Sequence, residues 1–172
     1  MNIQIREIKP EDYEALGTIM VDVYSNLDGF PTPSEQPKYY KMLRNVGSLS
    51  EKPNTKVLIA LSDKGKLLGG VVYFSDMAQY GSRGTATEQQ NASGIRLLAV
   101  RRDTRRGGVG KALTMACIDL ARKSGNKQVI LHTTKSMQIA WGMYERLGFY
   151  RSEDLDFNQG ELSVYGFRLN LI

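Results

Sequence analysis

The chain has 172 residues, of which 41% are hydrophobic and 24% are charged, and its formal net charge is +5. This length and composition favour a single globular domain over residues 1–172 and exclude collagen-like and disordered chains. No apolar run is long enough to cross a bilayer, and the charged N-terminus does not resemble a signal peptide. We therefore expect a cytoplasmic protein with no membrane partner. One cysteine, Cys117, and one histidine, His132, predict neither a disulfide nor a structural metal site.

The N-terminal half predicts a strand, two helices and a hairpin. Alternation indicates strands, whereas apolar residues at three- and four-residue steps indicate helices. The turn Ser62–Gly65 between two β-branched runs is typical of a hairpin. The expected elements are a strand over 2–8, a helix from Pro10 to about Ser25–Gly29, a helix capped by Ser34, and strands over 55–62 and 66–74.

The C-terminal half predicts strands that alternate with helices. Residues 75–93 are polar, contain glycine and show no period, so we expect a functional loop that could act as a lid. The remaining expected elements are a buried strand over 94–100, a helix from Val109 to about Ser124, a strand over 127–134, a helix from Ser136 to Gly148, and strands over 149–156 and 161–171.

The element order is therefore βααβββαβαββ. It predicts an α/β (α+β) domain with a mixed central sheet of about seven strands flanked by about four helices, because strand-helix-strand units imply parallel crossovers.

The basic, glycine-rich stretch Arg101–Lys111 carries +4 of the net charge. It is not a Walker motif, because Arg105 stands where a glycine is required and Ala112 stands where a hydroxyl residue is required. It is not a dinucleotide fingerprint, because Leu113 replaces the third glycine. Glycines at a helix start can still bind an anion through free N–H groups, which fits a pyrophosphate without a metal. The alternative is an ordinary solvated loop before a helix.

Two motifs resemble the GNAT superfamily of acyl-CoA-dependent N-acyltransferases. Residues 105–110, Arg-Arg-Gly-Gly-Val-Gly, match its Gln/Arg-x-x-Gly-x-Gly/Ala turn, and residues 137–149, "MQIAWGMYERLGF", are similar to its Asn-x-x-Ala-x-x-Leu-Tyr-Glu-x-Leu-Gly-Phe helix. Together they span about Leu97 to Phe149, and the element order agrees outside that span. The resemblance implies a GNAT-like fold and transfer of an acetyl group from acetyl-CoA, as co-substrate, directly to a primary amine of a small molecule or peptide.

The resemblance also implies a site. The strand 94–100 splays from the strand 127–134, the pantetheine arm of coenzyme A enters the gap, and a backbone N–H polarises the thioester carbonyl. Tyr144 protonates or hydrogen-bonds the departing thiolate, or else only packs on the inner helical face. The implied cofactor-binding residues are Leu98, Ala99 and Val100 at the strand edge, and Arg105, Arg106, Gly107, Gly108, Val109, Gly110 and Lys111 around the pyrophosphate.

The chain departs from the family pattern in two places. Met137 replaces the asparagine that begins the second motif, so one polar contact is missing. The central strand carries Arg96 as its only charged residue, where many relatives have a glutamate base. Glu88, Asp76, His132 or a water could accept the proton of the amine, although His132 is more typical of a structural histidine. Cys117 lies on an apolar helical stripe and is expected to be a core residue.

The acceptor is expected between residues 24–40 and the loop 75–93. Aromatic residues beside Glu35 suit a cation with an apolar body, or they belong to the core: Phe30, Tyr39 and Tyr40. Two further hypotheses stay open. One is a catalytically silent coenzyme-A-binding regulatory protein, and the other, less favoured, is a nucleic-acid binder using the arginines of the basic stretch, so we expect no nucleic-acid partner. An exposed final strand could pair across a homodimer interface.

Overall fold

The computed structural model describes residues 2–104 and 107–171. One mixed sheet organises the fold, in the order β1-β2-β3-β4-β5-β8-β6, with β7 paired to β8. The pair β4 and β5 is parallel and the other pairs are antiparallel. The strands are β1 (Gln4–Glu7), β2 (Thr55–Leu61), β3 (Leu67–Phe74), β4 (Ala92–Val100), β5 (Gln128–Thr133), β6 (Tyr150–Arg151), β7 (Phe157–Gln159) and β8 (Leu162–Asn170).

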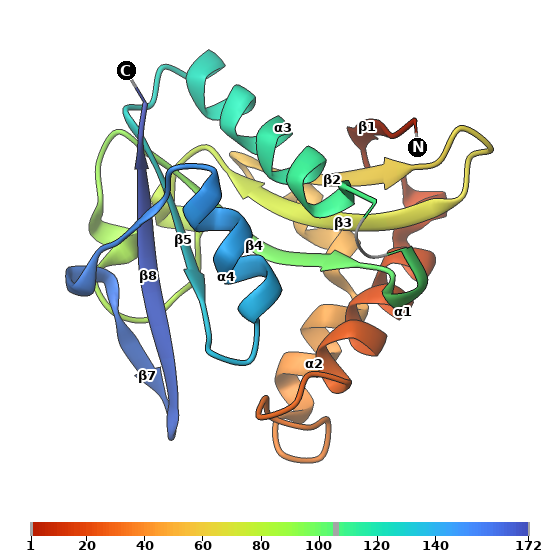
Figure 1. Cartoon of the computed structure of the whole chain (residues 1–172), viewed down its shortest axis with the longest axis horizontal. Helices are drawn as coiled ribbons and strands as arrows, with labels where there is room; N and C mark the ends of the chain where they lie inside the picture. Colours follow the sequence, from red (N-terminus) through yellow and green to blue (C-terminus); the bar gives the residue numbers. More distant parts are fainter. Residues whose placement is uncertain (1, 105–106, 172) are drawn as a thin grey trace.

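Helices cover both faces of this sheet (Figure 1). One apolar core lies under α1 and α2 and includes Leu16, Met20 and Leu43, whereas the other lies under α3 and α4 and includes Leu113 and Phe149. Within the described residues, no helix has both the length and the apolar character needed to cross a bilayer. The helices are α1 (Tyr13–Ser25), α2 (Pro37–Arg44), α3 (Val109–Lys123) and α4 (Gln138–Arg146).

The predicted fold class is confirmed, but two predicted helix caps are wrong. Gln36 is the N-cap of α2. The Ser34 hydroxyl instead lies 3.1 Å from the Thr32 hydroxyl within the preceding turn, and the fixed φ of Pro37 suits the first helical position. Met137, not Ser136, precedes the first residue of α4.

The predicted strand over 149–156 is also wrong, because its second half turns away. After β6, a short 3₁₀ helix buries Leu155 completely and the chain then forms the additional strand β7. A Cβ on Gly166 would lie 2.3 Å from the Cβ of Leu155, so only glycine allows this packing. The Asp156 carboxylate fixes the turn by accepting a hydrogen bond from the Gly166 N–H at 2.6 Å.

The loop between β3 and β4 is fastened to the core and is not a free lid. It forms two 3₁₀ helices, over Met77–Gln79 and Ala86–Glu88. Between them the Tyr80 ring is fully buried, in space left by Gly94, where a Cβ would lie 2.3 Å from the ring. The loop therefore brings the backbone that follows Tyr80 to a fixed place beside the sheet.

Candidate functional site

The strands β4 and β5 separate in the middle of the sheet. They pair only from Ala92 to Ile95 on β4, although β4 continues to Val100. Leu97 has φ +58°, and the register of β4 against β3 shifts at the same place. A positive φ is uncommon for a non-glycine residue and bends the strand. The end of β4 thus leaves its neighbour, which is the separation that the family resemblance implies.

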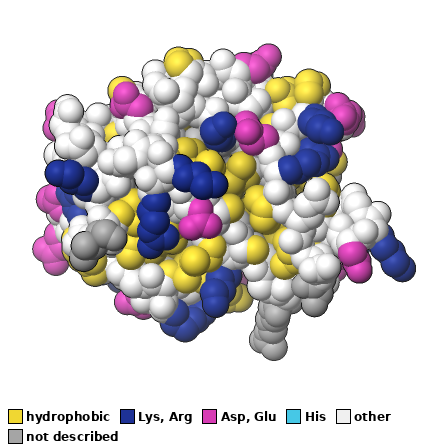
Figure 2. Space-filling view, turned by 90° about the horizontal axis from the view of Figure 1, so that it is seen from above, with side chains coloured by type: hydrophobic (Ala, Val, Ile, Leu, Met, Phe, Trp, Pro, Cys, Tyr) yellow, Lys and Arg dark blue, Asp and Glu magenta, His cyan; other side chains and the backbone are white. Residues whose placement is uncertain are grey.

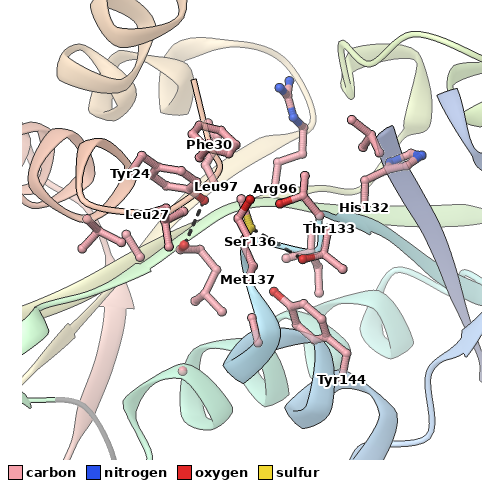
Figure 3. Close-up of a pocket in the computed structure, with 18 of the residues that line it drawn as sticks. Tyr24, Leu27, Phe30, Arg96, Leu97, His132, Thr133, Ser136, Met137 and Tyr144 are labelled. Atoms are coloured by element: carbon pink, nitrogen blue, oxygen red, sulfur yellow. Dashed lines mark hydrogen bonds between the residues drawn. The ribbon is translucent and has the colours of Figure 1, made fainter. Parts of the chain in front are cut away.

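A cavity of about 710 Å³ occupies this separation, within the range of small-molecule sites. It runs from the first turn of α3, along β4, to the aromatic side chains of α1 and the segment before α2 (Figure 3). Its walls include most of the residues predicted for cofactor binding that the structure describes: Leu98, Ala99, Val100, Gly108, Val109, Gly110 and Lys111. Arg105 and Arg106 lie outside the described residues.

The start of α3 forms one end of the cavity. Gly108 is the N-cap with φ +81°, a left-handed conformation that favours glycine. The Ala112 N–H donates to the Gly108 carbonyl at 3.0 Å, so the N–H groups before Ala112 precede the first intrahelical bond. A Cβ on Gly110 would lie 3.7 Å from both Met143 Sδ and Val100 Cγ2. A methyl group on Gly110 would therefore fit between β4 and α4 without a clash.

Two arginines of the basic stretch are paired with acids. Arg102 makes two hydrogen bonds of 2.9 Å to the Asp22 carboxylate on α1, and Arg101 bonds Asp103 at 3.1 and 3.0 Å. Figure 2 shows acidic side chains among the basic ones on one face of the molecule. These pairs reduce the charge available for phosphates, which weakens the nucleic-acid hypothesis.

Tyr144 of α4 lies at the cavity wall, where its hydroxyl points inward (Figure 3). The residue is 5% exposed, and its ring packs edge-on against Phe149 with centroids 5.8 Å apart. Burial raises the pKa of the Tyr144 phenol well above its usual range. Tyr144 is therefore protonated at neutral pH and can donate a hydrogen bond into the cavity.

His132 also reaches the cavity, but both of its ring nitrogens are engaged. Nε2 lies 2.8 Å from the Leu155 carbonyl and must donate, so Nδ1 accepts from the Tyr80 hydroxyl at 2.9 Å. Burial, followed by the nearby charge of Arg96, lowers the pKa of His132. This neutral tautomer fits a structural role.

The carboxylates considered from the sequence are not brought to the cavity. Glu88 and Asp76 are exposed, and Asp76 Oδ1 accepts from the Ala78 N–H at 2.9 Å. Glu35 is held by Thr32, whose N–H and hydroxyl donate to its Oε1 at 3.0 and 2.9 Å. Among the described residues, the cavity walls include no Asp or Glu, and no group of three potential metal ligands is present. The structure therefore does not bring Glu35 to the cavity, although Phe30 and Tyr39 line it.

Aromatic side chains form the other end of the cavity. Tyr24, Phe30 and Tyr39 pack together with ring centroids 5.5–6.3 Å apart. The Tyr24 hydroxyl donates to the Leu98 carbonyl at 3.0 Å and so ties α1 to the bent part of β4. Cys117 is fully buried in the other core, and burial raises the pKa of its thiol, which fits the predicted core role.

Three features of the site were not predicted from the sequence. The bend at Leu97 has no local signal, because leucine does not favour a positive φ. Arg96 was noted only as the residue replacing an acid, yet it lines the cavity. The Thr134 hydroxyl is buried at the cavity wall and has no hydrogen-bond partner among the described residues, and only the fold reveals it.

Known proteins resemble this chain in sequence or in fold. An N-alpha-acetyltransferase 30 from Schizosaccharomyces pombe is 30% identical over 93 residues, which cover 54% of this chain and 57% of that protein. The match thus spans little more than half the length of that relative.

Two solved structures share the fold over nearly their whole length. A GNAT-family acetyltransferase from Staphylococcus aureus Mu50 superposes with a TM-score of 0.76 at 18% identity, covering 99% of this chain and 100% of that one. The PaiA N-acetyltransferase from Thermoplasma acidophilum, solved in complex with coenzyme A, gives 0.70 at 18% identity, covering 96% and 98%. The sequence profile of the acetyltransferase (GNAT) family matches residues 13–149. With this match over most of its length, and with the separated strands and glycine-lined helix start, the chain belongs to the GNAT family of acetyltransferases.

Proposed function

We propose that this acetyltransferase moves an acetyl group from acetyl-CoA directly to a primary amine. The observation that carries the proposal is the single cavity that joins the glycine-lined start of α3, the open edge of β4 and the Tyr144 hydroxyl. Acetyl-CoA supplies the acyl group as a thioester. The cavity offers what this co-substrate requires, namely free N–H groups for a diphosphate, a strand edge for an amide-containing arm and an apolar channel.

The cofactor end uses mainly backbone groups. The N–H groups from Gly107 to Lys111, with Arg105 and Arg106, hold the pyrophosphate. Leu98, Ala99 and Val100 pair with the pantetheine arm, and a backbone N–H at the bend of β4 polarises the thioester carbonyl. The Tyr24 hydroxyl supports this arrangement, because its bond to the Leu98 carbonyl holds the bend in place.

Tyr144 assists the departing thiolate. Burial makes a phenol a weaker acid than the free side chain, whose pKa is about 10. A hydrogen bond from Tyr144 stabilises the charge that develops on sulfur.

The described cavity walls carry no carboxylate, so we propose a water as the acceptor of the amine's proton. The name of the partly matching relative, an N-alpha-acetyltransferase, favours an α-amine over a side-chain amine.

Two measurements test the proposal. Calorimetry with acetyl-CoA measures cofactor binding, and release of free thiol during incubation with amino acids, polyamines, aminoglycosides and peptides measures transfer. The proposal predicts binding and acetylation of at least one amine class. Failure to bind acetyl-CoA would refute it.

The lack of a carboxylate in the described cavity walls favours a second candidate, a coenzyme-A-binding protein without catalysis. Acetyl-CoA binding with no thiol release across the whole panel would support this candidate and would refute the proposed transfer.

A further inference from the structure

Arg96 occupies a place in the cavity that the proposed chemistry does not use. It immediately precedes the bend at Leu97, and its side chain extends to the side away from Tyr144, between Phe30 and His132 (Figure 3). Tyr144 marks the position proposed for the departing sulfur. Arg96 therefore lies on the acceptor side of the reacting carbonyl.

The guanidinium group of Arg96 is held in one orientation. Its Nη1 donates to the Tyr80 carbonyl at 3.0 Å, and its Cζ lies 5.8 Å from the centroid of the buried Tyr80 ring. Nη1 also lies 3.3 Å from the position that a Cβ would take on Gly81, so the loop backbone comes close to it because residue 81 is glycine. A guanidinium has several further N–H donors, and in the described structure those of Arg96 have no protein acceptor.

The charge of Arg96 has no counter-ion within salt-bridge distance among the described residues. Asp156, which acts on the neighbouring His132, is already paired with Arg151 at 2.7 Å and bonded to the Gly166 N–H. The charge of Arg96 acts on both sides of the cavity. It adds to burial in lowering the pKa of His132, and it counteracts the rise that burial causes in the pKa of Tyr39. A partly buried cation without a partner is costly, and a bound anion would remove that cost.

We infer that Arg96 binds the carboxylate of the acceptor, so that the substrate is a small amino carboxylate such as an amino acid. A planar guanidinium with free parallel donors matches a carboxylate and binds it in a bidentate manner. Because Arg96 and the bend at Leu97 line the same cavity, one molecule can present a carboxylate to the first and an amine to the second. Phe30 and Tyr39 provide an apolar wall for its side chain. Polyamines and aminoglycosides, which carry only cations, are disfavoured.

This inference rests on the proposed function. Pairs of substrates that differ only in the carboxylate distinguish its failure from the failure of the proposed function. Thiol release is measured with amino acids and with the corresponding amino acid amides, for the wild type, Arg96→Gln, Arg96→Lys and the control Arg122→Gln. Arg122 is an exposed residue of α3 whose salt bridge among the described residues is to Asp119, and it does not line the cavity, so its variant removes the same charge elsewhere. Calorimetry with acetyl-CoA accompanies each variant and checks that the fold and the cofactor end are intact.

We expect the wild type to prefer the carboxylates and Arg96→Gln to lose that preference. The kcat/KM for the carboxylates should fall about 10- to 100-fold, as expected for loss of charge-assisted hydrogen bonds, whereas that for the amides stays unchanged. Arg96→Lys should retain part of the preference, and Arg122→Gln all of it. Equal use of carboxylates and amides by the wild type, or an equal loss on both in Arg96→Gln, would overturn the inference and leave the acetyltransferase proposal standing. No acetylation of any amine would refute both.

Discussion

Gly110→Ala should make the protein more stable and bind acetyl-CoA more weakly. A Cβ at this position would lie 3.7 Å from Met143 Sδ and from Val100 Cγ2, and 3.8 Å from Leu98 Cδ2, all ordinary van der Waals distances. The fold therefore accepts the methyl group. Alanine is favoured over glycine in a helix by up to about 1 kcal/mol, which corresponds to a rise in Tm of about 2–4 °C for a chain of this size.

The same methyl group would add to the cavity wall at the start of α3, where we propose that the diphosphate binds. Loss of one hydrogen bond to a charged group costs about 1.5–3 kcal/mol, so the Kd for acetyl-CoA should rise about 10- to 100-fold. Thermal unfolding without ligand measures the first effect, and calorimetry with acetyl-CoA measures the second. General damage to the fold would lower both stability and affinity, so it cannot produce a higher Tm together with weaker binding of acetyl-CoA.

Two other glycines provide controls. Gly142→Ala lies within α4, where its Cβ would meet only the movable end of the Arg146 side chain at 3.1 Å. It should raise Tm and leave the Kd unchanged. Gly108→Ala should lower stability by about 1–2 kcal/mol, because its φ of +81° is unfavourable for alanine. If Gly110→Ala bound acetyl-CoA as tightly as the wild type, the pyrophosphate would not lie at this helix start.

The remaining predictions concern three side chains around the cavity. Tyr144→Phe should lower kcat about 100-fold with a proven acceptor and leave acetyl-CoA affinity unchanged. The control Tyr150→Phe, on an exposed side chain, should have no effect, and full turnover by Tyr144→Phe would end the proposed role. Tyr24→Phe removes the hydrogen bond to the Leu98 carbonyl and should cost about 1 kcal/mol in a urea titration; no loss would mean that this bond does not hold the bend. Because the pKa of His132 is lowered in the folded state, the unfolded chain takes up the proton first. Stability should therefore be unaffected above pH about 7 and fall as pH drops through about 6.5. In His132→Gln this part of the pH dependence should disappear, and its persistence would assign it to other groups.

The spacing of apolar residues predicted the order of the elements, because burial of one face imposes a helical or strand period on the sequence. The apolar stripe of α3, with Val109, Leu113 and Cys117, lies in the core as expected. Element ends were less predictable, since a serine near a helix start has other partners available. Ser34 bonds Thr32 within a turn, and the fixed φ of Pro37 suits the observed start of α2.

The residues proposed for the cofactor end could be named from the sequence, and most of those that the structure describes line one cavity, whereas the residues of the other end could not be named. Glycines at a helix start can be recognised in a sequence, because a residue without a Cβ lets a ligand approach the backbone closely. The position of Arg96 depends on contacts between distant segments, in which Tyr80 fills the space left by Gly94 and presents its carbonyl. The bend at Leu97 is likewise imposed by its surroundings, since a leucine has no preference for that conformation.

Hydrogen exchange of the backbone amides, with and without acetyl-CoA, tests the central claim that the separated strands hold the co-substrate. We predict increased protection at Leu98–Val100 on β4 and at Gly107–Lys111 at the start of α3, with no change at β1 and β2 on the far side of the sheet. Absence of protection at both β4 and α3, or protection confined to another face, would contradict the account.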